Sequence, residues 1–237
     1  MSRESTVPRL ARLAQDQWGF VTRRQAENAG VSPATIQRLA DKGVLERVAN
    51  GVYRLSGAPI PDHPDLRAAW LQLAPDVPAW RRATDQGVVS HRSAAALYRL
   101  GHLPADLHEF TLPVRRQSRR VDVRLHRGKL KPTEHNTLGG LPVTRPARIA
   151  SDLLRDKEDP QSVAHVVNDA IRGAFDYPGK FADSLAPHAA AFGLRRRDGV
   201  ALLRWFLDLV GDPGAKDWLA EAREHVDRNV QREAIRG

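Results

Sequence analysis

A short predicted helix near the start of the chain carries cationic and polar side chains along one face. Helical spacing within residues 32–42 puts Thr35, Arg38 and Lys42 on one side. A guanidinium can donate two hydrogen bonds to the O6 and N7 atoms of guanine, and amide or hydroxyl groups can supplement it at other bases. The spacing therefore predicts a helix face that fits the major groove of double-stranded DNA.

Further cationic residues are predicted beside this helix face, at positions that could contact the DNA backbone. Arg23 and Arg24 begin the preceding predicted helix, which would cross the backbone, and the hairpin that follows offers phosphate or groove contacts. Exposed arginines on a small helix can instead be ordinary solvated surface, and paired helices of this kind also bind proteins. The residues that we predict to contact DNA are Arg23, Arg24, Thr35, Gln37, Arg38, Lys42, Arg47, Asn50 and Arg54.

The densest positive segment lies further along, at residues 115–120. It bridges two strand-like stretches, 109–112 and 121–126, in which apolar and polar residues alternate. The segment could extend a DNA footprint, dock an acidic partner, or form the solvated tip of a hairpin that protects a sheet edge. All three interpretations stay open at this point. The residues predicted for this secondary contact with a polyanion or partner are Arg81, Arg82, Arg115, Arg116, Arg119 and Arg120.

The charge of the chain is uneven along its length. Lysine and arginine total 37 against 28 acidic residues, which gives a net charge of +9. Residues 1–60 carry 9 basic and 5 acidic side chains, residues 61–130 carry 12 and 7, and residues 131–237 carry 16 of each. This distribution predicts that residues 1–130 face a polyanion and that residues 131–237 form a neutral part of the protein.

Signatures of catalysis and metal binding are not found in the sequence. The chain has no cysteine, so thiol nucleophiles, disulfides and thiolate zinc sites are excluded. None of the nine histidines falls in a metalloprotease or hydrolase spacing, and Ser90-His91 fits the start of a helix better than a catalytic pair. We therefore predict no catalytic residue, no metal and no cofactor. A degenerate nuclease is the weakest alternative, because no Asp…Glu-x-Lys strand pattern is found.

Local signals in the first sixty residues predict three helices and a hairpin. Residues 22–25 (Thr-Arg-Arg-Gln) have the capping-box pattern, and residues 32–33 pair a capping serine with a proline in the first helical position. Between them, Gly30 is suited to end a helix. Asn50-Gly51 then marks the tip of a hairpin whose arms alternate with period two. This order is that of a winged helix-turn-helix domain, which we predict over residues 1–57.

The remaining chain is predicted to mix strands and helices and then to become helical. Residues 56–64, with three prolines and a glycine, form the natural linker. Strands and helices follow to about residue 155, and only helices are predicted over 161–232. We therefore expect an α+β protein with an N-terminal winged helix-turn-helix, a mixed α/β middle region and a helical C-terminal part. The last two are expected to form one domain over residues 65–237.

The apolar runs of the sequence are only a few residues long. They are too short for a membrane span, and the first residues lack the apolar stretch of a secretory signal. The expected compartment is the cytoplasm, with no membrane partner.

Three segments near the start of the chain follow one another in a characteristic order: residues 18–26, 43–48 and 51–55. Together with their surroundings, over about residues 9–56, they resemble the N-terminal winged-helix domain of AbiEi-type antitoxins. The later segments 89–95 and 140–148 are similar to stretches that follow in the same proteins.

This resemblance implies a bacterial antitoxin of a type IV toxin-antitoxin system. Such a protein represses its own operon by binding operator DNA through the winged helix, and it counteracts a nucleotidyltransferase-like toxin through its C-terminal region. The implied partners are operator DNA and the cognate toxin. The alternative from another class is a protein-interaction module that neutralises an acidic partner by direct binding and has only nonspecific affinity for DNA.

Overall fold

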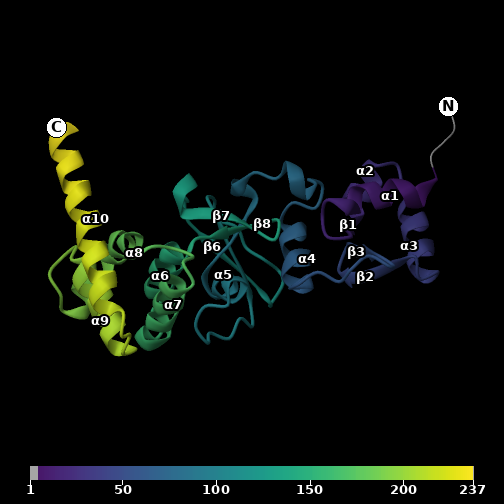
Figure 1. Ribbon diagram of the computed structural model, residues 1–237. Helices are drawn as coiled ribbons and strands as arrows, with labels where there is room; N and C mark the ends of the chain where they lie inside the picture. Colours follow the sequence, from purple (N-terminus) through teal and green to yellow (C-terminus); the bar gives the residue numbers. More distant parts are fainter. Residues whose placement is uncertain (1–4, 237) are drawn as a thin grey trace.

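The computed structural model describes residues 5–236 of the chain. Figure 1 shows three parts in chain order: a small N-terminal unit, a sheet with its flanking helices, and a group of helices that ends in α10 (Ala215–Arg236). None of the helices in this described part is long and apolar enough to cross a membrane. The predicted α+β class is confirmed.

The N-terminal unit has the order of a winged helix. Its elements are α1 (Thr6–Gln15), β1 (Phe20–Thr22), α2 (Arg23–Asn28), α3 (Pro33–Asp41), β2 (Leu45–Ala49) and β3 (Val52–Leu55). The strands form an antiparallel sheet in the order β1-β3-β2. The sequence predicts only an extended link at residues 18–21, and the structure shows that this link supplies the third strand.

Local capping sets where α2 and α3 begin. Thr22 Oγ1 accepts a hydrogen bond from Gln25 N at 3.1 Å, and Gln25 Oε1 accepts one from Thr22 N at 3.0 Å, which completes the capping box. Ser32 Oγ accepts from Thr35 N at 3.2 Å at the start of α3. Behind these helices lies a small core of Leu10, Val21, Ala26, Val31, Ile36, Leu39, Leu45 and Tyr53.

The middle region is built around a five-stranded sheet in the order β6-β5-β4-β8-β7. Its elements are α4 (Pro64–Leu73), β4 (Val88–Val89), α5 (His91–Tyr98), β5 (His108–Leu112), β6 (Val123–Arg127), β7 (His135–Leu138) and β8 (Leu141–Thr144). Strands β4 and β7 are not predicted from the sequence. Two residues are too few to show a period, and three of the four residues in β7 are polar.

Strands β5 and β6 run parallel, with His108 opposite Val123 and Leu112 opposite Arg127. A tight hairpin can join only antiparallel strands, so the chain between them must run back along the sheet. The interpretation of the arginine-rich segment as a hairpin tip is therefore wrong. We call residues 113–122 the crossover.

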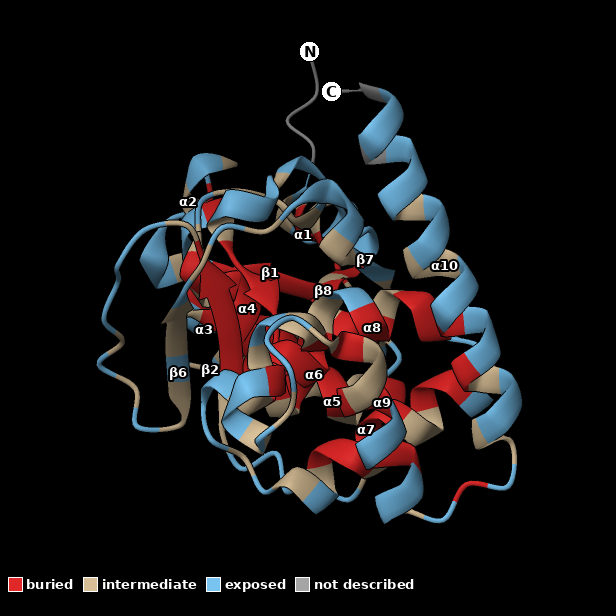
Figure 2. Ribbon diagram, turned by 90° about the vertical axis from the view of Figure 1, so that its left-hand side faces the viewer, coloured by how far each residue is buried: buried red, intermediate tan, exposed pale blue. Residues whose placement is uncertain are grey.

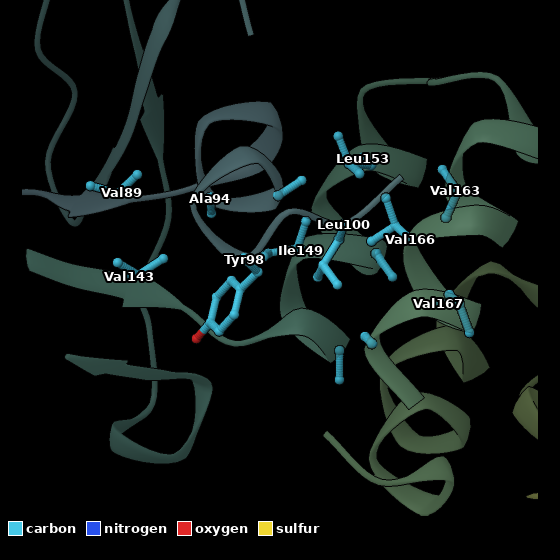
Figure 3. Close-up of a cluster of buried hydrophobic side chains, with 14 of the residues drawn as sticks. Val89, Ala94, Tyr98, Leu100, Val143, Ile149, Leu153, Val163, Val166 and Val167 are labelled. Carbon is cyan, nitrogen blue, oxygen red and sulfur yellow. The ribbon is translucent and has the colours of Figure 1, made fainter. Parts of the chain in front are cut away.

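The mixed region ends in α6 (Pro146–Arg155). The part that follows is helical, as predicted for residues 161–232, and consists of α7 (Pro160–Arg172), α8 (Pro178–Leu185), the 3-10 helix η4 (Ala186–Phe192), α9 (Gly199–Leu209) and α10. In Figure 2 most of α10 is exposed, whereas buried residues gather on the central strands of the sheet and on the helix faces packed against them. Figure 3 shows side chains of β8, α5, α6 and α7 meeting in one apolar cluster, among them Val143, Tyr98, Ile149 and Val166. The sheet and the tail thus share a core.

Candidate nucleic-acid interface

The predicted base-contacting residues lie on the outer side of α3: Thr35, Gln37, Arg38 and Lys42. Gln37, Arg38 and Lys42 are exposed and Thr35 is half-buried, while the apolar stripe of the helix faces the core. Gln37 Nε2 donates to Asp41 Oδ1 at 2.8 Å, and Thr35 Oγ1 lies 3.0 Å from Ser32 Oγ. Arg38 therefore stands in the middle of an exposed polar face whose neighbours are held by local hydrogen bonds.

Arg23 and Arg24 lie in the first turn of α2, with side chains 54% and 70% exposed. Arg23 Nε donates to Glu27 Oε1 at 2.7 Å, and this hydrogen bond raises the pKa of Arg23 above its ordinary value. Arg24 NH1 lies 3.7 Å from the same carboxylate. Because Arg24 is more exposed and less closely paired, it is the better placed of the two to bind a phosphate.

The tip of the β2–β3 hairpin, the wing, rests on α4. Gln72 Nε2 donates to Asn50 O at 2.7 Å, and Arg23 N donates to Gly51 O at 2.8 Å. Arg47 in turn donates to Asn50 Oδ1 at 3.0 Å. These bonds place the wing tip beside the first turn of α2 and hold both against the middle region.

Arg54 is turned away from solvent, with a side chain only 12% exposed. It donates to the carboxylate of Glu46, its cross-strand neighbour, and to Ala58 O. These contacts hold the hairpin and the chain that leaves it. The predicted contact of Arg54 with DNA stays untested, and we leave this residue out of the interface proposed below.

The two arginines at residues 81–82 differ in their surroundings. Arg81 is exposed, whereas Arg82 is half-buried and stacks on Trp70 with its guanidinium carbon 4.2 Å from the ring centre. Burial lowers the pKa of Arg82 to about 10. Arg82 donates to the backbone carbonyls of Trp70, Leu71, Ala74 and Val77. We therefore interpret Arg82 as a structural residue that caps the end of α4, rather than as a contact for a polyanion.

Buried glutamines of the N-terminal unit hold the segment that follows α4. Gln25 Nε2 donates to Val77 O at 3.1 Å, and Gln17 Oε1 accepts from Ala79 N at 3.2 Å. Both glutamine side chains are buried, and they also bond to each other at 2.6 Å. No motif of the sequence assigns a role to Gln17. It is a polar residue that directly precedes the link at residues 18–21, and this position does not reveal a partner 62 residues away.

Trp18 forms a second connection between the N-terminal unit and the middle region. Its Nε1 donates to Gly139 O at 2.9 Å, and the guanidinium of Arg67 stacks over its ring at 4.4 Å. The rings of Trp18 and Trp70 meet edge to face with centroids 5.9 Å apart. These contacts add to the glutamine bonds and keep the two parts in a defined arrangement.

A cavity of about 470 Å³ opens where α2, the wing, α4 and the crossover meet. Its apolar lining residues are Ala69, Leu73, Val123 and Leu125. Its cationic lining residues are Arg23, Arg24, Arg116, Arg119 and Arg120. Among the described residues that line the cavity, none is acidic. The structure thus brings arginines from two separately predicted sets into one concave surface.

A buried polar cluster lies where α5 meets strands β5 and β6. His91 has a left-handed φ of 53°, and its ring stacks on His126 with centroids 3.5 Å apart and planes 13° apart. His126 Nε2 lies 2.6 Å from Glu109 Oε2, and donor atoms of both histidines and Asp156 fall within 4.8 Å of one another. Parallel rings direct their nitrogen lone pairs side by side rather than toward one point. We therefore interpret the group as a packed polar cluster, which the sequence does not reveal because its members are far apart in the chain.

This cluster makes stability depend on pH. Burial and the neighbouring His126 lower the pKa of His91 to about 3, whereas an unfolded histidine titrates near about 6.5. Between these values the unfolded chain binds more protons than the folded one, so stability present at neutral pH is lost as the pH falls from about 6.5 toward 3. We expect His91→Asn, which tolerates the left-handed backbone, to weaken this acid destabilisation. Thermal unfolding at pH 8 to 4 measures it.

The exposed His102→Asn variant is the matched control and should keep the wild-type acid profile. Indistinguishable profiles for His91→Asn and the wild type would show that His91 does not carry the effect.

Comparison with known families tests the identity of the N-terminal unit. Residues 8–56 match the model of a family described as transcriptional regulators of the AbiEi antitoxin type. The N-terminal unit is similar to this family. The match covers about a fifth of the chain, from α1 to β3, and confirms the resemblance over these residues. The similarity of later segments to AbiEi-type antitoxins stays a prediction. No curated protein matches the chain.

Proposed function

We propose that this AbiEi-type regulator is the antitoxin of a bacterial toxin-antitoxin system that binds operator DNA and represses its own operon. The observation that carries the proposal is the exposed polar face of α3 within a winged helix that matches an antitoxin regulator family. A role of the C-terminal region in counteracting a nucleotidyltransferase-like toxin is part of the proposal. That role rests on the family resemblance.

We assign DNA binding and the antitoxin role to two different domains, each with its own core. Residues 1–57 form the DNA-binding domain and residues 65–237 the antitoxin domain. The separate core of the winged helix supports this division. Phe20 and Val52 join the larger core instead, so the two domains are packed together rather than loosely tethered.

The proposed contacts follow from the placement of α3. With this helix in a major groove, Arg38 donates two hydrogen bonds to a guanine, and Gln37 exchanges its bond to Asp41 for one to a neighbouring base. Lys42 and Arg24 meet phosphates on either side, which position the protein without reading sequence. Sequence preference is therefore expected to depend mainly on Arg38.

Replacing Arg38 by alanine tests base reading. We expect Arg38→Ala to weaken binding to the operon's own upstream region by about 1–3 kcal/mol, or about 5- to 150-fold. The loss of affinity for scrambled DNA should be much smaller, because there the variant loses only one nonspecific attraction between a cation and the phosphates. Equilibrium titrations of both DNAs by electrophoretic shift measure the difference.

The exposed Arg204→Ala variant, on α9, controls for the change in net charge. It should bind both DNAs like the wild type. Equal losses on both DNAs for Arg38→Ala would rule out a base-reading role.

A further inference from the structure

The last turns of α10 extend beyond the helices against which this helix packs. Leu219 and Ala222, in the first half of α10, are buried in the shared core. Figure 1 shows the same helix, in yellow, continuing past α8 and α9. On these later turns the side chain of Val230 is 61% exposed. The projecting part of α10 therefore presents an apolar side chain to solvent.

A groove of about 560 Å³ lies between α9 and α10, beside these turns. Trp205 lines the groove and is 37% exposed, and its ring packs against Phe192 and Phe206 with centroids 5.1 and 5.3 Å away. Tryptophan buries a large apolar area when a partner covers it, and it is enriched at the centres of protein interfaces. The apolar lining residues of the groove are Leu194, Val200, Ala201, Trp205 and Val226. The groove is thus an apolar surface that holds a tryptophan in place.

Val230 continues this apolar lining along α10. It lies four residues after Val226, and residues four apart share one side of a helix. Val226 is half-buried in the groove, whereas Val230 lies one turn further on, where α10 projects. A helix from another molecule can pack along such a stripe by inserting its side chains between residues four apart. The stripe therefore fits a helical partner that covers both the groove and the projecting turns.

The charges in the groove favour a second copy of this chain as that partner. Arg223 and Asp227 both line the groove, are exposed and lie four residues apart on one side of α10. Within the described residues 5–236, neither side chain forms an ion pair. In an antiparallel pair of α10 helices with a two-fold axis near His225, Arg223 of each copy lies opposite Asp227 of the partner subunit. A second copy thus forms the same Arg–Asp pair twice.

We propose that α9 and α10 form the interface of a homodimer, in which the projecting turns of each α10 lie over the groove of the other copy. After the short connection at residues 210–214, α10 runs back along α9, so Trp205 lies beside the turn of α10 near residue 220. Val230 lies five residues beyond the axis and therefore reaches this turn and Trp205 of the partner subunit. The proposal goes beyond the proposed function and does not depend on it, because no DNA contact enters the argument.

Sedimentation velocity of the full-length protein without DNA measures this self-association. The wild type is expected to dimerise with a Kd below about 100 μM. Val230→Glu sets a carboxylate against the partner's Trp205 and should weaken dimerisation at least about tenfold. Val121→Glu, at an exposed valine of the crossover, is the matched control and should dimerise like the wild type. Because both valines are exposed, both variants should keep the circular dichroism spectrum of the wild type.

Two charge reversals test the two-fold arrangement. Arg223→Asp gathers four carboxylates around the axis, and Asp227→Arg gathers four guanidinium groups there. Each variant alone should therefore dimerise at least about tenfold more weakly than the wild type. In an equimolar mixture, one chain of each variant restores both Arg–Asp pairs, and the mixed dimer should form with an affinity within about threefold of the wild type.

A wild type that stays monomeric up to about 100 μM would overturn the proposal, and it is the result expected if the groove binds a different protein. A mixture of the two charge-reversed variants that stays as weakly associated as each variant alone would overturn it as well. So would a dimer whose affinity Val230→Glu leaves unchanged, because the two copies would then meet at another surface.

Discussion

The affinity of the protein for DNA is expected to fall by about five to seven powers of ten for each tenfold rise in salt concentration. Each phosphate that an arginine or lysine neutralises releases counterions, and about 0.9 powers of ten are lost per contact on a duplex. The candidates for phosphate contacts are Arg23, Arg24, Lys42, Arg47, Arg116 and Arg119, and Arg38 adds a seventh cation in the groove. Six or seven cations at about 0.9 each give a slope of about five to six, within the expected range.

Titrations at several salt concentrations between about 50 and 200 mM measure this slope, and affinity should change by roughly 10³- to 10⁴-fold over that range. The slope should be similar on upstream and scrambled DNA, because phosphate contacts do not depend on sequence. A slope near two would mean that few of these cations contact the DNA backbone. It would contradict the number of phosphate contacts assumed here.

Loss of the Arg82 side chain is expected to destabilise the fold by about 2–4 kcal/mol. Arg82 donates to carbonyls at the end of α4 and covers the ring of Trp70. In Arg82→Ala these half-buried carbonyls lose a charged donor, and Trp70 loses the contact over its face. Because Val77 is bonded by both Arg82 and Gln25, the change also loosens the junction with the winged helix.

Arg81→Ala is the matched control, because it removes the same side chain from an exposed neighbouring position. Scanning calorimetry should show the Tm of Arg82→Ala about 5–15 °C lower and that of Arg81→Ala within about 2 °C of the wild type. Similar small shifts in both variants would show that Arg82 does not cap α4 in the way that its contacts indicate.

Features with short-range causes could be predicted from the sequence. The capping box at Thr22 and the Ser32-Pro33 start of α3 depend on hydrogen bonds within four residues, and Asn50-Gly51 determines its own turn. The outward stripe of α3 follows from helical spacing. These signals were sufficient for the winged helix and for the position of Arg38 on its surface.

Features that depend on distant partners could not be predicted. The parallel pairing of β5 with β6 leaves no mark in either strand, since alternation looks the same in both directions. Arg81 and Arg82 are adjacent and identical in type, yet only Arg82 lies over Trp70. The approach of Arg119 to the wing likewise depends on how the crossover returns along the sheet.

The measurement that tests the central claim most directly is the ratio of the wild-type affinities for the operon's own upstream region and for scrambled DNA of equal length, at near-physiological salt. A sequence-specific repressor is predicted to prefer its upstream region by at least about a hundredfold, since specific sites exceed nonspecific DNA by about 10³ or more. Equal and weak binding to both DNAs would contradict the claim that α3 reads an operator.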